Sequence, residues 1–488
     1  MFHQINSKKW ADKLVLGLVF LLFSLGTKVQ STHADNSKIS SKISAEIHRI
    51  LKSKKMDIED TGLLVVDEAG QELVNINADK TFIPASISKI PTAMTAFETW
   101  DLSHQFTTQI WGEGVVKSGT LNGNLYLKGQ GEPSLVSERM WYIVNAFARS
   151  GITRIKGDLV VDEGYFDSIR WDADRLPMST DRAYDAPIGA LSFNWNSVNI
   201  FVRPSKVGTA AEIIIDPPNS YILNVINRTK TSSKGGASLN ASTEPVYKNN
   251  KFIGENVVVT GSISQTLSEK VLYRSISEPD LWAGYNFKEF LKSRNIIVDG
   301  DVIRGRTPSK ATLYFDEGGL FLRDIVGGMM KYSNNFVAEM LTKGISVEAG
   351  SSPGKMSTGL VQIHKLMEKA GISAGSYSFV SPSGLSRKNK LSPSQFVKLL
   401  RYAMNQSHWA PEFLSSLPLS GVDGTLKSRM KGLSVRAKTG LLTGVSSLAG
   451  YITTPNNRQL VFTFIYNGSN SFPAREAFDQ MCERLSRM

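Results

Sequence analysis

The two ends of the 488-residue chain have matching patterns, and this feature constrains the fold most. Residues 40–56 carry apolar side chains at helical spacing, and two strand-like segments, TGLLVVD and QELVNIN, follow them. At the other end, three segments are typical of strands: SVRAKTG, VSSLAGYITT and QLVFTFIYNG. The last segment is typical of a helix: PAREAFDQMCERLSRM. One antiparallel sheet built from both ends, with helices against it, accounts for both patterns.

The middle of the chain has a different texture. From Trp100 to about Pro308, short strand-like segments separated by Gly and Asn dominate. Two segments there have a helical pattern, SERMWYIVNAFARSG and LWAGYNFKEFLKSRN. Helical patterns resume from about residue 320. The sequence therefore predicts an α/β (α+β) fold in which a discontinuous domain, residues 35–99 and 310–488, is interrupted by a β-rich insertion.

The first 34 residues have the features of a secretory signal peptide. Lys8, Lys9 and Lys13 precede an apolar run that ends near Gly26, and this run is shorter than the roughly 18 residues of a membrane span. The segment 32–34 (Thr-His-Ala) offers small residues at the cleavage positions. We expect export to the periplasm, a mature chain that begins near residue 35, and no integral membrane segment after cleavage. An uncleaved N-terminal anchor is the alternative.

Charge and composition exclude several classes of protein. The 56 Lys and Arg outnumber the 44 Asp and Glu, and this spread positive charge favours an anionic envelope polymer over sequence-specific nucleic acid. The six His are scattered without a His-x-x-x-His pair, so we expect no metal site and no cofactor, and a zinc peptidase is disfavoured. Cys482 is the single cysteine, which rules out an intrachain disulfide.

Three short motifs occur in a characteristic order. Ser-x-x-Lys spans Ser86–Lys89 at a helix start, Ser-x-Asn spans Ser333–Asn335 between helices, and Lys-Thr-Gly spans Lys438–Gly440 at the end of a strand. Each motif alone is weak, because Ser-x-x-Lys also occurs at 352–355 and 428–431 and because helix capping is an ordinary role for serine and asparagine. The order in these contexts matches the serine acyl-transferase set of penicillin-binding proteins and β-lactamases.

The first motif contains a nucleophile and a base. A serine hydroxyl is a poor nucleophile unless a neighbouring base takes its proton, and Lys89 lies one helical turn after Ser86. A lysine acts as a base only when it is deprotonated, which burial and a second nearby cation favour, and Lys438 is the candidate for that cation. The helix start beneath Ser86 supplies positive potential where an oxyanion forms.

Longer segments carry a resemblance that covers essentially the whole mature chain. They are FIPASISKIPTAMTAF, GNLYLKGQGEPSL, IKGDLVVDEGYFDS, DAPIGALSFNWNSVNI, YSNNFVAEML, SPSGLSRKNKLSP, LPLSGVDGTLKSRMKG and VRAKTGLLTGVSSLAGY. The chain resembles the D-alanyl-D-alanine carboxypeptidase/endopeptidase family, the class C low-molecular-mass penicillin-binding proteins (peptidase family S13). The resemblance implies a serine β-lactamase/transpeptidase-like domain with a central antiparallel sheet flanked by helices. It also implies two small inserted domains, domain II (residues 100–190 and 265–309) and domain III (191–264).

The resemblance implies roles for individual residues. Ser86 would form the acyl-enzyme with Lys89 as its base, and Ser333 would relay a proton to the leaving amine. The residues implied in substrate binding are Asn335 for the peptide, Thr439 with Lys438 for the terminal carboxylate, Gly440, the N–H of Leu441 together with the Ser86 N–H as the oxyanion hole, and Asp162 and Arg387 for the stem-peptide side chain. A surface ion pair or a loop contact is the alternative for Asp162 and Arg387.

The implied function is that of a serine DD-peptidase acting on peptidoglycan stem peptides. Such an enzyme removes terminal D-Ala, cleaves D-Ala-diamino acid cross-links, or does both, and β-lactam antibiotics are its covalent inhibitors. Two positions depart from the family pattern: Leu441 replaces a hydroxyl residue, and 381–382 (Ser-Pro) replaces Asp-Gly, which would favour cross-links over free termini. The alternatives are a β-lactamase or esterase on the same scaffold and a non-catalytic peptidoglycan-binding module.

Overall fold

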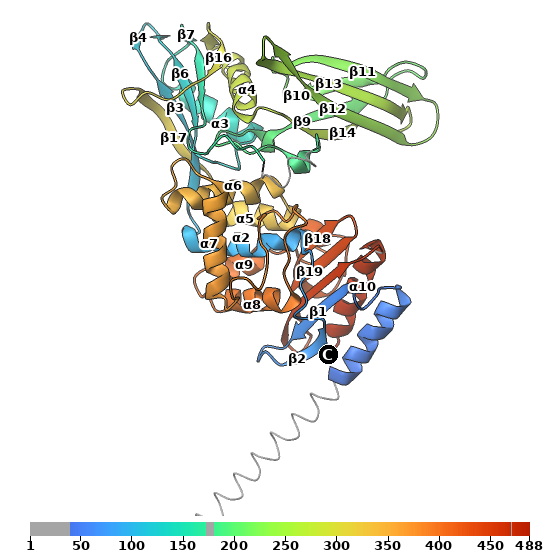
Figure 1. Cartoon of the computed structure of the whole chain (residues 1–488). Helices are drawn as coiled ribbons and strands as arrows, with labels where there is room; N and C mark the ends of the chain where they lie inside the picture. Colours follow the sequence, from blue (N-terminus) through green and yellow to red (C-terminus); the bar gives the residue numbers. More distant parts are fainter. Residues whose placement is uncertain (1–39, 172–179, 470) are drawn as a thin grey trace, which may run out of the picture.

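The chain forms two bodies that follow one another along the long axis of the molecule (Figure 1). The structure is a computed structural model that describes residues 40–171, 180–469 and 471–488. The lower body contains both ends of the described part of the chain, and the upper body contains the segment between them (Figure 1). The predicted signal peptide, residues 1–34, lies outside the described residues. Among the described residues, no helix has the length and apolar composition needed to cross a membrane.

Five antiparallel strands form the sheet of the lower body. In spatial order they are β18 (Ser434–Leu442), β19 (Val445–Thr453), β20 (Gln459–Asn467), β1 (Thr61–Val66) and β2 (Glu72–Ile76). Because β1 pairs with β20, the two ends of the chain meet inside one sheet. This confirms the prediction of a central antiparallel sheet built from both ends.

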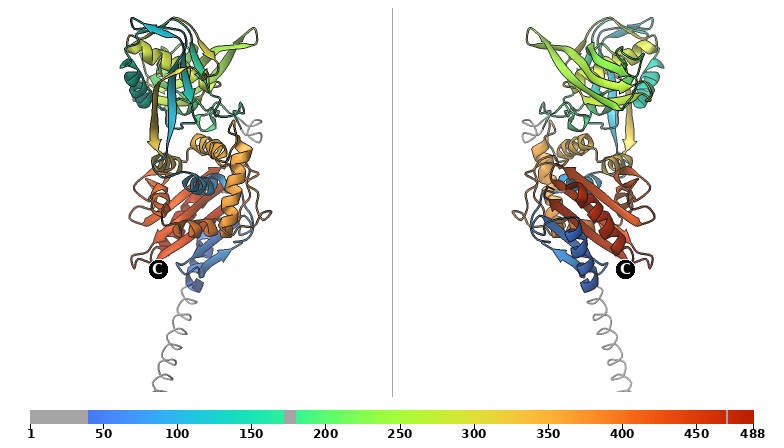
Figure 2. Two further views of the ribbon diagram at one scale, coloured as in Figure 1. Left: turned by 90° about the vertical axis from the view of Figure 1, so that its left-hand side faces the viewer. Right: turned by 90° about the vertical axis from the view of Figure 1, so that its right-hand side faces the viewer.

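Helices cover both faces of this sheet. On one face lie a helix over residues 40–53 and α10 (Ser471–Leu485), and their side chains Ile47 and Met481 share a core with Phe464 of the sheet. The helices on the other face are α2 (Lys89–Thr99), α5 (Leu322–Tyr332), α6 (Asn335–Glu348), α7 (Met356–Lys369), α8 (Pro393–Met404) and α9 (Ala410–Ser416). In the right-hand view of Figure 2 the α10 side faces the reader.

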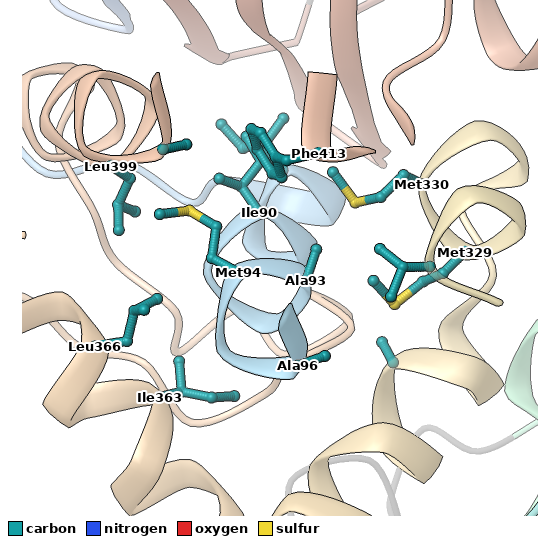
Figure 3. Close-up of a cluster of buried hydrophobic side chains, with 14 of the residues drawn as sticks. Ile90, Ala93, Met94, Ala96, Met329, Met330, Ile363, Leu366, Leu399 and Phe413 are labelled. Atoms are coloured by element: carbon teal, nitrogen blue, oxygen red, sulfur yellow. The ribbon is translucent and has the colours of Figure 1, made fainter. Parts of the chain in front are cut away.

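Helix α2 runs through the centre of the second core, as Figure 3 shows. Every residue from Lys89 to Phe97 is buried. The neighbours that surround α2 come from several helices and include Met329 and Met330 of α5, Ile363 and Leu366 of α7, Leu399 of α8 and Phe413 of α9. A helix packed on all sides is held in a fixed position, so the turn that precedes it is fixed as well.

The insertion between α2 and α5 is rich in β-structure, as predicted. One sheet contains β16 (Val302–Arg304), β8 (Leu159–Asp162), β6 (Leu125–Gly129), β3 (Gln105–Gly112) and β17 (Thr312–Phe321). A second contains β15 (Ile297–Val298), β7 (Arg154–Ile155), β5 (Thr120–Asn122) and β4 (Val115–Lys117). The two segments predicted to be helical form α3 (Ser137–Ala148) and α4 (Pro279–Ser293).

The remaining strands of the insertion form two three-stranded sheets. They are β10 (Glu212–Asp216), β9 (Ser197–Arg203) and β14 (Lys270–Ser275), and β11 (Ile222–Ser232), β13 (Lys251–Ser264) and β12 (Ala237–Lys248). Strand β14 pairs with β9 although residues 270–275 lie in the stretch predicted for domain II. The domain boundaries stay a prediction, and because of this pairing we propose that domain III extends to residue 275.

Candidate active site

The candidate nucleophile, Ser86, lies in a short 3₁₀ turn that leads into α2. This turn, η1 (Ala85–Ser88), places Ala85 at a φ of 51°, in the left-handed region that non-glycine residues seldom occupy. Pro84 precedes η1 and Ser88 precedes α2. Neither residue makes a capping hydrogen bond with its side chain. The half-buried hydroxyl of Ser86 is therefore not used to cap the helix, so the capping alternative is wrong.

Lys89 is completely buried, with an exposed fraction of 0%. Its Nζ donates hydrogen bonds to Ser86 Oγ at 3.1 Å, to Asn335 Oδ1 at 2.6 Å and to the carbonyl oxygen of Ser383 at 2.5 Å. An ammonium has three protons, and three oxygen atoms lie in place to accept them. The lysine of the first motif thus faces the serine of the same motif and the asparagine of the second.

The second motif lies where α5 ends and α6 begins. Ser333 has φ 58° and ψ 39°, a left-handed conformation that ends α5, and Asn334 caps α6 by accepting a hydrogen bond from the N–H of Val337. Because Asn334 provides the cap, the side chains of Ser333 and Asn335 are available for other contacts. Asn335 also donates to the carbonyl oxygen of Tyr184, which belongs to the insertion.

The third motif brings a second buried lysine to the site. Lys438 on β18 is completely buried, and its Nζ donates to Ser333 Oγ at 2.9 Å and to the carbonyl oxygen of Thr439 at 2.8 Å. Burial lowers the pKa of Lys438 to about 7, because a charged ammonium is unfavourable away from water. At neutral pH this lysine can therefore hold or release a proton.

Gly440 allows β18 to pass very close to the nucleophile turn. A Cβ atom at this position would lie 2.1 Å from Ser447 Oγ, 2.8 Å from the carbonyl oxygen of Pro84 and 3.0 Å from the nitrogen of Ser86. Only glycine fits there, and the close approach brings the backbone of the following residue, Leu441, toward Ser86.

The direction of the Leu441 N–H follows from the pairing of β18. The N–H of Ala437 points away from β19, because it donates to the carbonyl oxygen of Pro418. In an antiparallel ladder this direction alternates, so the N–H groups of Thr439 and Leu441 also point away from β19. The side chain of Leu441 is 47% exposed.

The hydrogen bonds of the two residues predicted for the stem-peptide side chain go to residues outside the three motifs. The carboxylate of Asp162 accepts hydrogen bonds from Arg306 and from the N–H groups of Gly164 and Thr307. Burial acts to raise the pKa of Asp162, but these hydrogen bonds outweigh it and hold the pKa below its usual value. Arg387 is exposed and donates to the carbonyl oxygen of Thr443 in the turn after β18.

The segment 381–389 begins with the Ser-Pro pair that departs from the implied family pattern, and it contacts the nucleophile turn. Ser381 donates its N–H to Asn389 Oδ1, and Asn389 donates back to the Ser381 carbonyl oxygen and to Ser88 Oγ. Gly384 has φ +82°, and a Cβ there would lie 2.0 Å from the carbonyl oxygen of Ala85. The Ser-Pro sequence at 381–382 therefore lies in a loop that Asn389 connects to the nucleophile turn.

Sequence reasoning missed several contributors to the site. They are the carbonyl oxygens of Ser383 and Tyr184, the side chain of Asn389, and Thr425, whose hydroxyl bonds to that of Thr439. Asn389 lies inside SPSGLSRKNKLSP, one of the segments that resemble the family, and this resemblance could have indicated its role. The carbonyl contacts have no such signal, because any residue carries a carbonyl. The described residues contain no group of three or more His, Cys, Asp or Glu that could hold a metal ion.

The fold and the cluster together define a class of protein. Ser86 at the start of a buried helix, Ser333 between two helices and Lys438 on a neighbouring sheet edge form the arrangement of the serine β-lactamase/transpeptidase class. A sequence model of the D-Ala-D-Ala carboxypeptidase 3 (S13) family matches residues 43–488. The chain therefore belongs to that peptidase family, and the resemblance inferred from the sequence is confirmed.

Individual relatives agree with this membership. A D-alanyl-D-alanine carboxypeptidase of Actinomadura sp. (strain R39) is 31% identical over 481 residues, which cover 95% of this chain and 87% of the relative. The D-alanyl-D-alanine carboxypeptidase DacB of Haemophilus influenzae is 26% identical over 82% of this chain and 83% of its own. The crystal structure of penicillin binding protein 4 (dacB) from the same organism superposes with a TM-score of 0.76 at 23% identity, covering 91% and 99% of the two chains, and it supports the fold.

Proposed function

We propose that this protein is a serine DD-peptidase that acts on peptidoglycan stem peptides through an acyl-Ser86 intermediate. It removes the terminal D-Ala, cleaves cross-links that follow a D-Ala residue, or does both. One observation carries the proposal: two buried lysines each face a serine hydroxyl, Lys89 at 3.1 Å from Ser86 and Lys438 at 2.9 Å from Ser333. Family membership supports the same activity.

In the proposed acylation step, Ser86 Oγ attacks the carbonyl carbon of the penultimate D-Ala. Lys89 acts in its neutral form, whose lone pair accepts the hydroxyl proton as the oxygen–carbon bond forms. The negative charge that develops on the substrate oxygen is stabilised by two backbone N–H groups, those of Ser86 and Leu441. The approach of β18 to the Ser86 turn and the outward direction of the Leu441 N–H support this oxyanion site.

The leaving amine then requires a proton when the carbon–nitrogen bond breaks. Ser333 can donate its hydroxyl proton to this amine and recover one from Lys438, since its Oγ is the acceptor of the Lys438 hydrogen bond. A protonated Lys438 also attracts the terminal carboxylate of the substrate, together with the hydroxyl of Thr439. Water hydrolyses the acyl-enzyme afterwards and regenerates Ser86. We further propose that Asn335 binds the substrate peptide and that Asp162 and Arg387 contact the stem-peptide side chain.

The proposed partners are peptidoglycan stem peptides as substrates and β-lactam antibiotics as covalent inhibitors. Family membership and a structural relative in complex with a β-lactam support this choice. Peptidoglycan lies outside the cytoplasm, so we also propose export to the periplasm, which the pattern of residues 1–34 supports.

Mass spectrometry of the intact protein tests the proposal. Incubation with benzylpenicillin should add the mass of the drug, Ser86→Ala should abolish the adduct, and Ser352→Ala, in an exposed Ser-x-x-Lys sequence, should retain it. Incubation with purified muropeptides should release D-Ala or split dimers. An adduct that maps to Ser333 or Ser352 would contradict the nucleophile assignment, and rapid turnover of the penicillin with no muropeptide cleavage would favour a β-lactamase.

A further inference from the structure

The loop over residues 418–426 contacts both halves of the candidate site, although none of its residues belongs to the three motifs. It first runs beside the edge strand β18, where the N–H of Ala437 donates to the Pro418 carbonyl oxygen and the N–H of Ser420 donates to the Val435 carbonyl oxygen. The pairing ends at Ala437, so the loop turns away one residue before Lys438.

The same loop is attached to the end of α5. Asp423 forms an ion pair of 2.6 Å with Lys331, which lies two residues before Ser333, and also accepts the N–H of Leu419. Burial acts to raise the pKa of Asp423, but hydrogen bonds from Lys331 and Leu419 outweigh it and lower the pKa. Gly424 has φ +54°, and a Cβ there would lie 2.6 Å from the Lys331 carbonyl oxygen, so the backbones touch.

The loop then reaches the third motif through a side chain. The hydroxyl groups of Thr439 and Thr425 are 2.8 Å apart, and in this structure Thr439 donates to Thr425. Thr425 lies in the short turn η5 (Gly424–Leu426), directly after the residues that bind Lys331. The position of the Thr425 hydroxyl is therefore fixed by β18 on one side and by α5 on the other.

We propose that Thr425 is a positioning residue that orients the Thr439 hydroxyl toward the carboxylate of the substrate. Each hydroxyl has one hydrogen and two lone pairs, so Thr439 cannot donate to Thr425 and to a carboxylate at the same time. When the carboxylate binds, the hydrogen bond reverses: Thr425 donates to Thr439, and Thr439 donates to the carboxylate. Each hydroxyl keeps its own proton, and the chain of two hydrogen bonds strengthens the outer one.

Because the role of Thr439 rests on the proposed function, the experiment separates the two. Cleavage is measured on one D-Ala-D-Ala peptide with a free terminal carboxylate and on the same peptide with a terminal amide. Thr425→Val should lower kcat/KM on the free acid by about two- to tenfold, mainly through KM, which is the loss expected for one neutral hydrogen bond. The amide should be cleaved at the wild-type rate. Thr425→Ser, which keeps the hydroxyl, should behave as wild type on both peptides.

Two controls complete the design. Thr99→Val removes a hydroxyl that donates to the Thr95 carbonyl oxygen one turn earlier, and it should change the cleavage of neither peptide. In a Thr439→Val background, Thr425→Val should have no further effect on the free acid. If penicillin still acylates Ser86, two results would overturn the role of Thr425. They are an equal loss of kcat/KM on the acid and the amide, and no loss of kcat/KM on the acid. A wild-type protein that neither forms the adduct nor cleaves either peptide would overturn the proposed function and this role with it.

Discussion

Two serine–lysine pairs lie side by side in the candidate site, and they differ in how each lysine is held. Lys89 lies at the start of a helix packed on all sides, and three oxygen atoms from three separate segments accept its hydrogen bonds. Lys438 lies on an edge strand, and its two acceptors are Ser333 and the carbonyl oxygen of its own neighbour, Thr439. The first pair is fixed from several directions, whereas the second lies next to the strand edge where we propose that the substrate binds.

A third buried lysine shows what a structural role looks like here. Lys343 on α6 is also almost fully buried, but its Nζ forms an ion pair of 2.6 Å with the carboxylate of Asp167. A buried ammonium with a carboxylate partner is neutralised as a pair. The hydrogen bonds given above for Lys89 and Lys438 go instead to hydroxyl, amide and carbonyl oxygens, which favour a role in proton transfer or in anion binding.

Removing the base of the first pair should have the largest effect. Lys89→Met should slow acylation by benzylpenicillin by about 10²- to 10⁴-fold, the usual contribution of a general base. Lys355→Met, in an exposed Ser-x-x-Lys sequence, should leave the rate unchanged. The rate is measured from the intact mass at timed intervals, with thermal unfolding as a check of folding. A greater loss in Lys438→Met than in Lys89→Met would transfer the role of base to the second pair.

Removing the cation of the second pair should have an intermediate effect. A charge-assisted hydrogen bond between Lys438 and the terminal carboxylate is worth roughly 1.5 to 3 kcal/mol. Lys438→Ala should therefore lower kcat/KM on a D-Ala-D-Ala peptide by about 10- to 150-fold from this contact alone. The loss should be smaller on the terminal amide. A loss of the same size on both peptides would show that Lys438 acts only through the proton relay.

The depressed pKa of Lys438 also predicts how stability depends on pH. Its value of about 7 in the folded protein lies below that of an unfolded chain, so the unfolded state binds more protons between the two values and stability rises with pH in that window. Below pH 7 the cost of burying the ammonium is fully present. Lys438→Met should therefore raise Tm relative to wild type by a few degrees at pH 6, and by less at pH 9. A difference in Tm that does not change with pH would contradict the shifted pKa.

The fold follows from local sequence patterns, whereas the first serine–lysine pair follows from the order of three motifs. Both ends of the chain show clear strand and helix patterns, and these patterns favour one sheet built from both ends, in which the structure pairs β1 with β20. Ser-x-x-Lys occurs three times, however, and only the order of the three motifs selected residues 86–89. The structure separates the three occurrences by burial, since Lys89 is buried while Lys355 and Lys431 are exposed.

The contacts that support the two pairs could not be predicted, for a physical reason. The carbonyl oxygen of Ser383 accepts from Lys89 only because a loop nearly 300 residues later folds beneath the Ser86 turn. The carbonyl oxygen of Tyr184 reaches Asn335 from the insertion in the same way. Backbone groups carry no residue-specific pattern, so their positions emerge only from the packed fold. The binding roles of Asp162 and Arg387 stay predictions.

The smallest expected effect concerns Leu441, beside the second pair. The family resemblance implies a hydroxyl residue at this position, and Leu441→Thr adds one neutral donor near the place where we propose that the carboxylate binds. Such a donor contributes about 1 kcal/mol, so kcat/KM on the free acid should rise several-fold. The outward N–H of Leu441 is a backbone group that survives the substitution, so the oxyanion site is unchanged. The rise should be smaller on cross-linked dimers, where the group at this place differs from a free D-Ala terminus. If Leu441→Thr leaves both substrates unaffected, the leucine is neutral and does not favour cross-links over free termini.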